Sequence, residues 1–176
     1  MDDKCKLRID MIKLWSCHIF YISDYIISSV AKIDNLQLIE ERLEQNQNDI
    51  GNLFGNVYGR YNGNRFSELL KENISLEIEF INSTIKGEIE ESVSHNLRWH
   101  MGIIKIVDFL SAIDDNFDRP YLRGLFFDHL HLTEEYLMTR IHKDYSNEIK
   151  SFDSLYSQVL LIANTLSYIM SYRIND

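Results

Sequence analysis

The chain has 176 residues, of which 45% are hydrophobic and 26% are charged, as in one ordinary globular domain. Its formal net charge of −9, with Lys and Arg scattered along the sequence, disfavours nucleic-acid binding, which needs clustered positive charge. Residues 19–30 form the most apolar run. They are too few and too polar to cross a bilayer, and the charged start does not fit a signal peptide, so we expect no membrane contact.

The two cysteines favour a reducing compartment. If Cys5 and Cys17 both lie on the first helix, they are about 18 Å apart, which is too far for a disulfide. We therefore expect free thiols and a cytoplasmic protein.

Apolar residues recur at helical spacing along almost the whole chain, whereas the alternation typical of strands is nearly absent. The first predicted helix covers residues 7–31, and a second begins after the cap-like pair Asp34–Asn35. Four glycines between residues 51 and 63 are interleaved with Asn, Arg and Tyr. This composition predicts a bent or broken stretch rather than a seam where two helices pack closely.

The third predicted helix runs from about Asn64 to Gly87, and three further helices follow it. The fourth runs from about Glu88 to Ala112, and the apolar face predicted for it contains Val93, Leu97, His100, Ile104, Val107 and Leu110. Asp118 is expected to cap the fifth, with Pro120 in its first turn, and the sixth begins near Tyr145.

The expected fold follows from these long helices and short turns. The sequence contains one proline and neither an internal repeat nor a linker, so we expect a single domain over residues 1–176. Long helices joined by short turns pack against their neighbours in opposite directions. The predicted fold is therefore all-α, an up-and-down antiparallel helical bundle with four long core helices plus one or two accessory helices.

Polar residues on the apolar faces are the candidates for a site. His18 shares its stripe with Trp15, and His129 shares one with Phe126. Other candidates are His100 on the fourth helix and Glu77 beside the apolar face of the third. Helical bundles build metal sites from such inward-facing His and carboxylate side chains.

Two interpretations of these residues stay open. In the first, His18 and His129 bind iron, manganese or zinc, with Glu77 or His100 completing the site, and the two rings then lie within about 5 Å. In the second, the same side chains only form hydrogen bonds inside the core, as buried polar groups normally do. The chain lacks the Glu-x-x-His signature of ferritin-like di-metal sites, which favours the second interpretation.

Catalysis by a nucleophile is poorly supported. Cys17 is next to His18 in the sequence, but neighbours on a helix diverge by about 100°, so these two side chains do not form a thiolate–imidazole pair.

Several short motifs are spread over nearly the whole chain. They are Trp-x-x-His at residues 15–18, Arg-Leu-x-x-Asn-Gln-x-Asp-Ile-Gly at 42–51 and His-Leu-x-x-Thr at 129–133. Together they resemble a family of small, uncharacterised bacterial helical-bundle proteins from spore-forming lineages. The sequence is also similar, more distantly, to metal-binding bundle proteins that use core His and Glu. The resemblance implies a bundle fold and no particular activity. The chain has Asn73 where the family has His, and Asn is a poor metal ligand.

These observations lead to three hypotheses for function. The first is a non-catalytic structural or interaction protein with a polar, His-containing core. The second is a metal-binding four-helix-bundle protein that uses core His and Glu, and the third is a small-ligand sensor. A homodimer is expected in addition, because such bundles often leave one helix face exposed.

Overall fold

The computed structural model describes residues 2–174, and this part of the chain contains six α-helices and no strand. The helices are α1 (Asp3–Ala31), α2 (Leu36–Tyr58), α3 (Arg60–Lys86), α4 (Ile89–Ile113), α5 (Arg119–Ile141) and α6 (Tyr145–Ser171). The predicted all-α class is therefore confirmed. None of these helices combines the length and the apolar composition needed to cross a bilayer.

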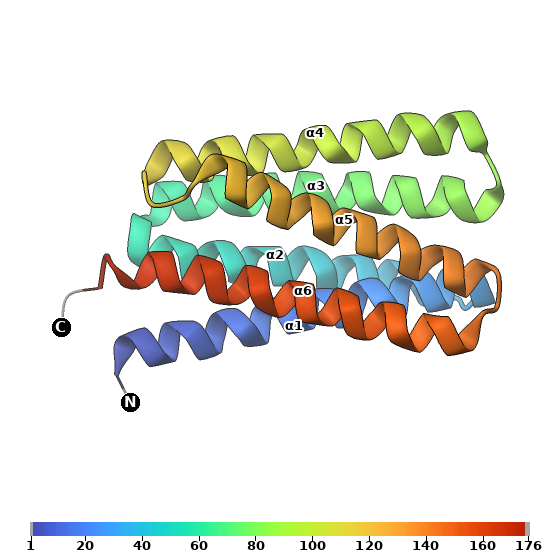
Figure 1. Cartoon of the computed structure of the whole chain (residues 1–176), viewed down its shortest axis with the longest axis horizontal. Coiled ribbons are helices and arrows are strands. Elements are labelled where there is room, and N and C mark those ends of the chain that lie inside the picture. The colour runs from blue at the N-terminus through green and yellow to red at the C-terminus, as the bar shows by residue number, and fades with distance from the viewer. Residues whose placement is uncertain (1, 175–176) are drawn as a thin grey trace.

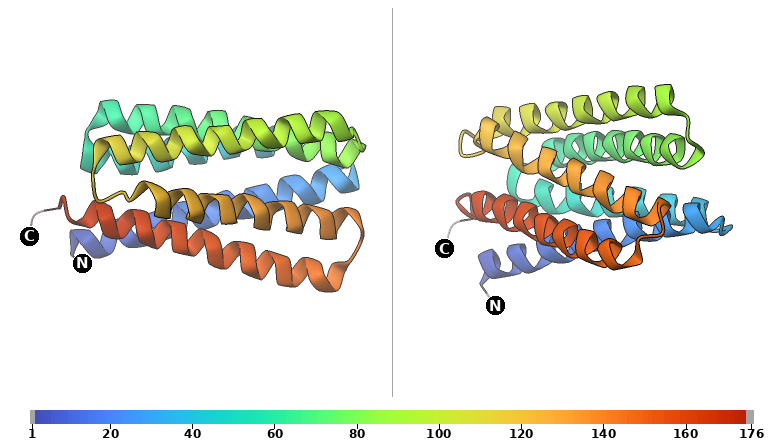
Figure 2. Two further views of the ribbon diagram at one scale, coloured as in Figure 1. Left: turned by 45° about the horizontal axis from the view of Figure 1, so that its top comes forward. Right: turned by 45° about the vertical axis from the view of Figure 1, so that its right-hand side comes forward.

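Each helix packs against the next one in the sequence, and α6 returns to pack against α1 (Figures 1 and 2). The six helices therefore close a ring, and α1 makes further contacts with α3 and α5. All six have between 23 and 29 residues. Helix length thus gives no basis for dividing them into four core and one or two accessory helices, and that finer prediction is not confirmed.

Side-chain caps begin three of the helices. The carboxylates of Asp2, Asp118 and Asp144 accept hydrogen bonds from backbone N–H groups in the first turns of α1, α5 and α6. Such caps satisfy donors that a helix start otherwise leaves unpaired. Asp118 was predicted in this role. Asn35 stands at the start of α2 as predicted, but its side chain makes no cap hydrogen bond.

The glycine-rich stretch turns out to be both a break and a packing seam. Gly59 separates α2 from α3 with a φ of 87°, where a side chain would be strained. Gly51 and Gly63 lie inside the two helices, which approach so closely that a Cβ on Gly63 would stand 2.6 Å from the Gly51 carbonyl oxygen. The predicted break does occur, but it is confined to Gly59 instead of extending over residues 51–63. The rejection of a packing seam was wrong, because Asn52, Asn56 and Arg60 are exposed and leave the helix contact to the glycines.

The predicted core face of α4 was wrong in its first half. Val93 and Leu97 are 58% and 63% exposed, and His100 is half-buried. The buried residues of α4 are Trp99, Gly102, Ile103, Ile106, Val107 and Leu110. The helix has apolar residues on two faces, and periodicity alone does not tell which face meets the bundle.

Candidate functional site

The site begins with two histidines that meet in the interior. His18 on α1 and His129 on α5 are each only 4% exposed, and their ring centroids are 5.7 Å apart. Trp15, one turn before His18, places its ring edge-on to the imidazole at 5.5 Å. The structure therefore brings together the two histidines that the sequence predicted to share one interior, but their separation of 5.7 Å exceeds the separation of about 5 Å expected of a metal site.

Burial keeps both imidazoles neutral. Loss of solvation lowers the pKa of His18 to about 3 and that of His129 to about 4. Repulsion from His129 contributes to the shift at His18. A neutral imidazole accepts at one ring nitrogen and donates at the other, so each ring has one acceptor and one donor position to fill.

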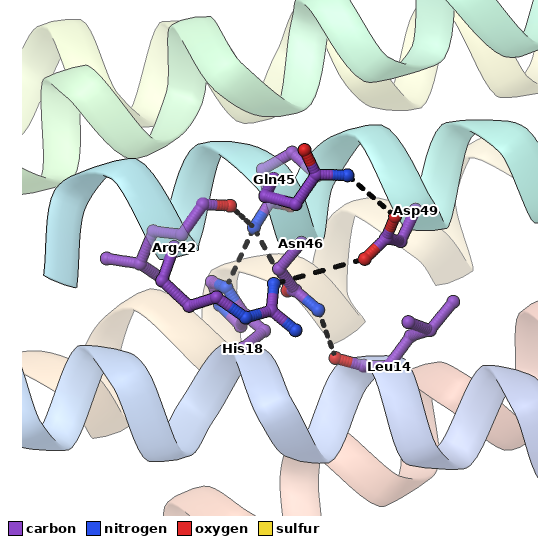
Figure 3. Close-up of polar contacts among 8 residues, drawn as sticks. Leu14, His18, Arg42, Gln45, Asn46 and Asp49 are labelled. Carbon is purple, nitrogen blue, oxygen red and sulfur yellow. Dashed lines mark hydrogen bonds and ion pairs between the residues drawn. The ribbon is translucent and has the colours of Figure 1, made fainter. Parts of the chain in front are cut away.

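Helix α2 supplies the polar partner of His18. The amide nitrogen of Gln47 lies 3.5 Å from His18 Nδ1, 3.3 Å from the Leu43 carbonyl oxygen and 3.3 Å from Asn46 Oδ1. An amide nitrogen can only donate, so His18 Nδ1 is the acceptor in its contact with Gln47 and the His18 proton is on Nε2. The two amide hydrogens are shared among these three neighbouring acceptors. Asn46 in turn donates to the Leu14 carbonyl at 3.0 Å, which ties α2 to α1 (Figure 3).

A second group of buried polar side chains lies on α3. Glu77 is 1% exposed, and burial raises the pKa of its carboxyl group to about 8, so Glu77 is protonated at neutral pH. Asn73 is one turn earlier on the same helix and is also buried. Gly102 on α4 makes room for it, because a Cβ at residue 102 would be 2.8 Å from Asn73 Oδ1.

Several of these buried polar atoms have no hydrogen-bond partner within residues 2–174. They are Trp15 Nε1, Asn73 Oδ1, Glu77 Oε1 and Oε2, Trp99 Nε1 and His129 Nδ1. The indole nitrogens are donors, and the Asn and Glu oxygens can accept. A buried polar group without a partner costs about 1–3 kcal/mol, so such groups call for a physical explanation.

Most of these side chains lie near the middle of their helices. His18, Gln47, Asn73, Trp99 and His129 lie within two residues of the middle of α1, α2, α3, α4 and α5. Because neighbouring helices run in opposite directions and have similar lengths, the midpoints of the helices lie at about the same height. We refer to Trp15, His18, Asn73, Glu77, Trp99 and His129 as the polar centre.

His100 does not belong to this centre. Its ring packs against Phe127 at 5.1 Å, and its Nδ1 bonds to the Asn96 carbonyl of its own helix at 2.9 Å. This is the ordinary environment of a half-buried histidine on a helix surface.

The predicted metal ligands come together only in part. The structure pairs His18 with His129. Within the described residues, however, no group of three His, Cys, Asp or Glu side chains is arranged to hold a metal ion, so neither Glu77 nor His100 completes such a set. Zinc sites use three or four protein ligands, and two imidazoles alone fall short of that number.

Sequence reasoning missed Gln47 and the indole groups of Trp15 and Trp99 as members of the site. The signal for Gln47 was present, because it is four residues after Leu43 and three before Ile50 and therefore falls on the apolar stripe of α2. The indole nitrogens gave no signal, since tryptophan on an apolar face is ordinary core material.

Comparison with known proteins adds nothing to this geometry: no family model, no curated protein and no solved structure matches the chain. The resemblance drawn from the motifs therefore stays a prediction.

Proposed function

We propose that this chain is a non-catalytic interaction protein of the cytoplasm, a rigid bundle that acts through its surface while its histidines serve the core. The observation that carries this proposal is the burial of His18 and His129, each 4% exposed and in contact with the other. A catalytic imidazole must reach its substrate, and these two are closed off by packed helices.

The surroundings of the histidines support the structural role. Their low pKa values keep them neutral, and neutral imidazoles are easier to bury than charged ones. The contacts of His18 with Gln47 and of Asn46 with the Leu14 carbonyl join α1 to α2 at a defined register. Buried polar contacts of this kind favour one helix arrangement over alternatives that would leave them unpaired. The two cysteines are free, in keeping with a reducing compartment.

Elemental analysis tests this proposal. Protein purified without chelators should contain less than about one tenth of an equivalent of iron, manganese or zinc. His129→Ala should then lower the free energy of unfolding by about 2–4 kcal/mol, the usual cost of emptying a buried site. Near-stoichiometric metal that is lost in both His18→Gln and His129→Gln would refute the structural role.

The specific observation that favours metal binding is the 5.7 Å between the two ring centroids. At this separation one nitrogen of each ring can approach a shared ion, but the ion needs further ligands, because zinc sites use three or four protein ligands. His129 Nδ1 also lacks a partner. Titration with zinc, manganese and ferrous iron distinguishes the two functions, because metal binding predicts a higher melting temperature that His18→Gln abolishes.

A further inference from the structure

A pocket opens between α1, α5 and α6, near the turn that joins α5 to α6 (Figure 1). It has a volume of about 380 Å³, within the range of about 300–1,000 Å³ typical of small-molecule sites. It is lined by Ser23, Tyr136, Tyr145, Glu148, Ile149 and Phe152. Tyr136 is seven residues after His129, so the pocket lies about two turns along α5 from the polar centre.

Two buried hydroxyl groups of this pocket are bonded to each other. Ser23 Oγ lies 2.6 Å from Tyr136 Oη, and the two residues are 9% and 2% exposed. The pair has two O–H groups, and the bond between them uses only one. Within residues 2–174 neither hydroxyl has another hydrogen-bond partner, so one O–H group is left to donate. A buried donor without an acceptor is costly, and a ligand in the pocket can supply the acceptor.

Glu148 supplies the second polar group. Its side chain is 11% exposed, and its two carboxylate oxygens accept from Arg140 Nη1 at 3.2 and 3.4 Å. Burial raises the pKa of Tyr136, and the nearby charge of Glu148 acts in the same direction. A carboxylate has about four acceptor positions, so Glu148 can accept a further hydrogen bond beside the hydroxyl pair. Because Arg140 balances its charge, the pocket as a whole is close to neutral.

The rest of the lining is aromatic and apolar. The Phe152 ring lies 5.7 Å from the Tyr136 ring at an angle of 58°. Tyr145 and Ile149 are 56% and 67% exposed. A ligand in the pocket would remove part of this apolar surface from water, which is favourable. An aromatic ligand would gain ring contacts with Phe152 and Tyr145 in addition.

We propose that this pocket binds a small neutral phenol, with its ring against Phe152, Tyr145 and Ile149 and its hydroxyl between Glu148 and the Ser23–Tyr136 pair. A phenol hydroxyl accepts one hydrogen bond and donates another, so a single group matches both polar parts of the pocket. An ammonium group would meet the positive charge that already neutralises the carboxylate, and an anion would meet the carboxylate itself. This site goes beyond the proposed function, and it does not depend on what the histidines bind.

Titration of isotope-labelled protein with p-cresol, followed by NMR of the backbone amides, tests the proposal. The amides of Ser23, Tyr136 and Ile149 should shift with a dissociation constant of about 0.1–1 mM, since so small a ligand makes few contacts. Toluene, which lacks the hydroxyl group, should bind at least about fivefold more weakly. Benzylamine and benzoate, which carry opposite charges, should also bind more weakly than p-cresol.

A double variant tests the hydroxyl pair. Ser23→Ala or Tyr136→Phe alone leaves one O–H group in the pocket, so both changes are made together. Replacing both partners of a buried hydrogen bond by apolar groups is nearly neutral for folding, so this variant should fold. Its dissociation constant for p-cresol should rise at least about fivefold, to that of toluene. The matched control is Ser16→Ala with Tyr156→Phe, which removes a hydroxyl pair 3.3 Å apart that does not line the pocket.

The control variant should bind p-cresol within about twofold of the wild type. Amides that do not shift up to about 10 mM p-cresol, or shifts confined to other parts of the bundle, would overturn the site. Toluene, benzylamine or benzoate binding as tightly as p-cresol would overturn the ligand class. Equal losses in the two double variants would overturn the role of the Ser23–Tyr136 pair. None of these results bears on the metal content, which tests the proposed function by itself.

Discussion

Replacing Glu77 by Gln should remove a specific pH dependence of stability. Burial raises the pKa of Glu77 from 4.5 to about 8, so the folded chain keeps this proton at neutral pH, whereas the unfolded chain releases it. The folded state therefore binds one more proton between these two values. Linkage then requires the free energy of unfolding to fall as pH rises through this window.

The expected slope is about 1.4 kcal/mol per pH unit, or about 2 kcal/mol between pH 6 and pH 7.5. The stability that Glu77 contributes is fully present below its pKa in the unfolded chain. It is lost once the pH exceeds its pKa in the folded chain. Glutamine has nearly the same shape and no ionisable proton. Glu77→Gln should therefore gain about 2 kcal/mol on the wild type as pH rises from 6 to 7.5.

Urea unfolding followed by far-ultraviolet circular dichroism, at several pH values in this window, measures the effect. The difference between wild type and variant isolates Glu77, because every other group titrates in both proteins. Glu68→Gln is the matched control, since Glu68 is on the same helix with its side chain 60% exposed and paired with Arg65. Its profile should run parallel to that of the wild type. A Glu77→Gln profile parallel to the wild type would show that burial does not hold this proton.

Three other predictions concern the polar centre and the helix contacts. Because the pKa of His129 falls from 6.5 to about 4 on folding, His129→Gln should reduce the loss of stability between pH 6.5 and 4.5 by about 2–3 kcal/mol, measured by urea unfolding. Gly63→Ala should lower the melting temperature through a clash worth about 1–3 kcal/mol, whereas Gly124→Ala, with nothing within 4 Å of the new Cβ, should raise it slightly. Asp114→Asn should cost about 1.5–3 kcal/mol in urea unfolding, because the carboxylate accepts hydrogen bonds from Tyr58 and Arg173.

The histidine pair could be predicted because each ring occupies a helical position within an unambiguous apolar stripe. On α5 the predicted core residues Phe126, His129, Thr133 and Tyr136 are all buried. On α1 the predicted core residues Trp15, His18 and Ile22 are likewise buried. When one face of a helix is clearly apolar, the spacing of about 3.6 residues fixes which side chains point inward.

The orientation of α4 could not be predicted in this way. One apolar stripe of this helix contains Ile103 and Leu110, which are buried, and the other contains Val93 and Leu97, which are exposed. Both stripes satisfy helical periodicity, and only contact with α3 and α5 selects between them. The glycine seam has the same origin, because the close approach of Gly51 to Gly63 depends on how α2 and α3 fold back on one another at Gly59.

The titrating groups of the polar centre act on stability in opposite directions. Below pH 6.5 His18 and His129 become protonated in the unfolded chain, whereas their buried rings stay neutral in the folded chain. The free energy of unfolding therefore decreases as the pH falls. Above pH 4.5 Glu77 loses its proton in the unfolded chain but stays protonated in the folded chain. The free energy of unfolding therefore decreases as the pH rises. Between pH 4.5 and 6.5 the effect of the two histidines is larger than that of Glu77, so the free energy of unfolding increases with pH. Above pH 6.5 only Glu77 changes it, and it decreases. These three residues therefore place their combined optimum near pH 6.5, and removing the Glu77 contribution moves that optimum toward higher pH.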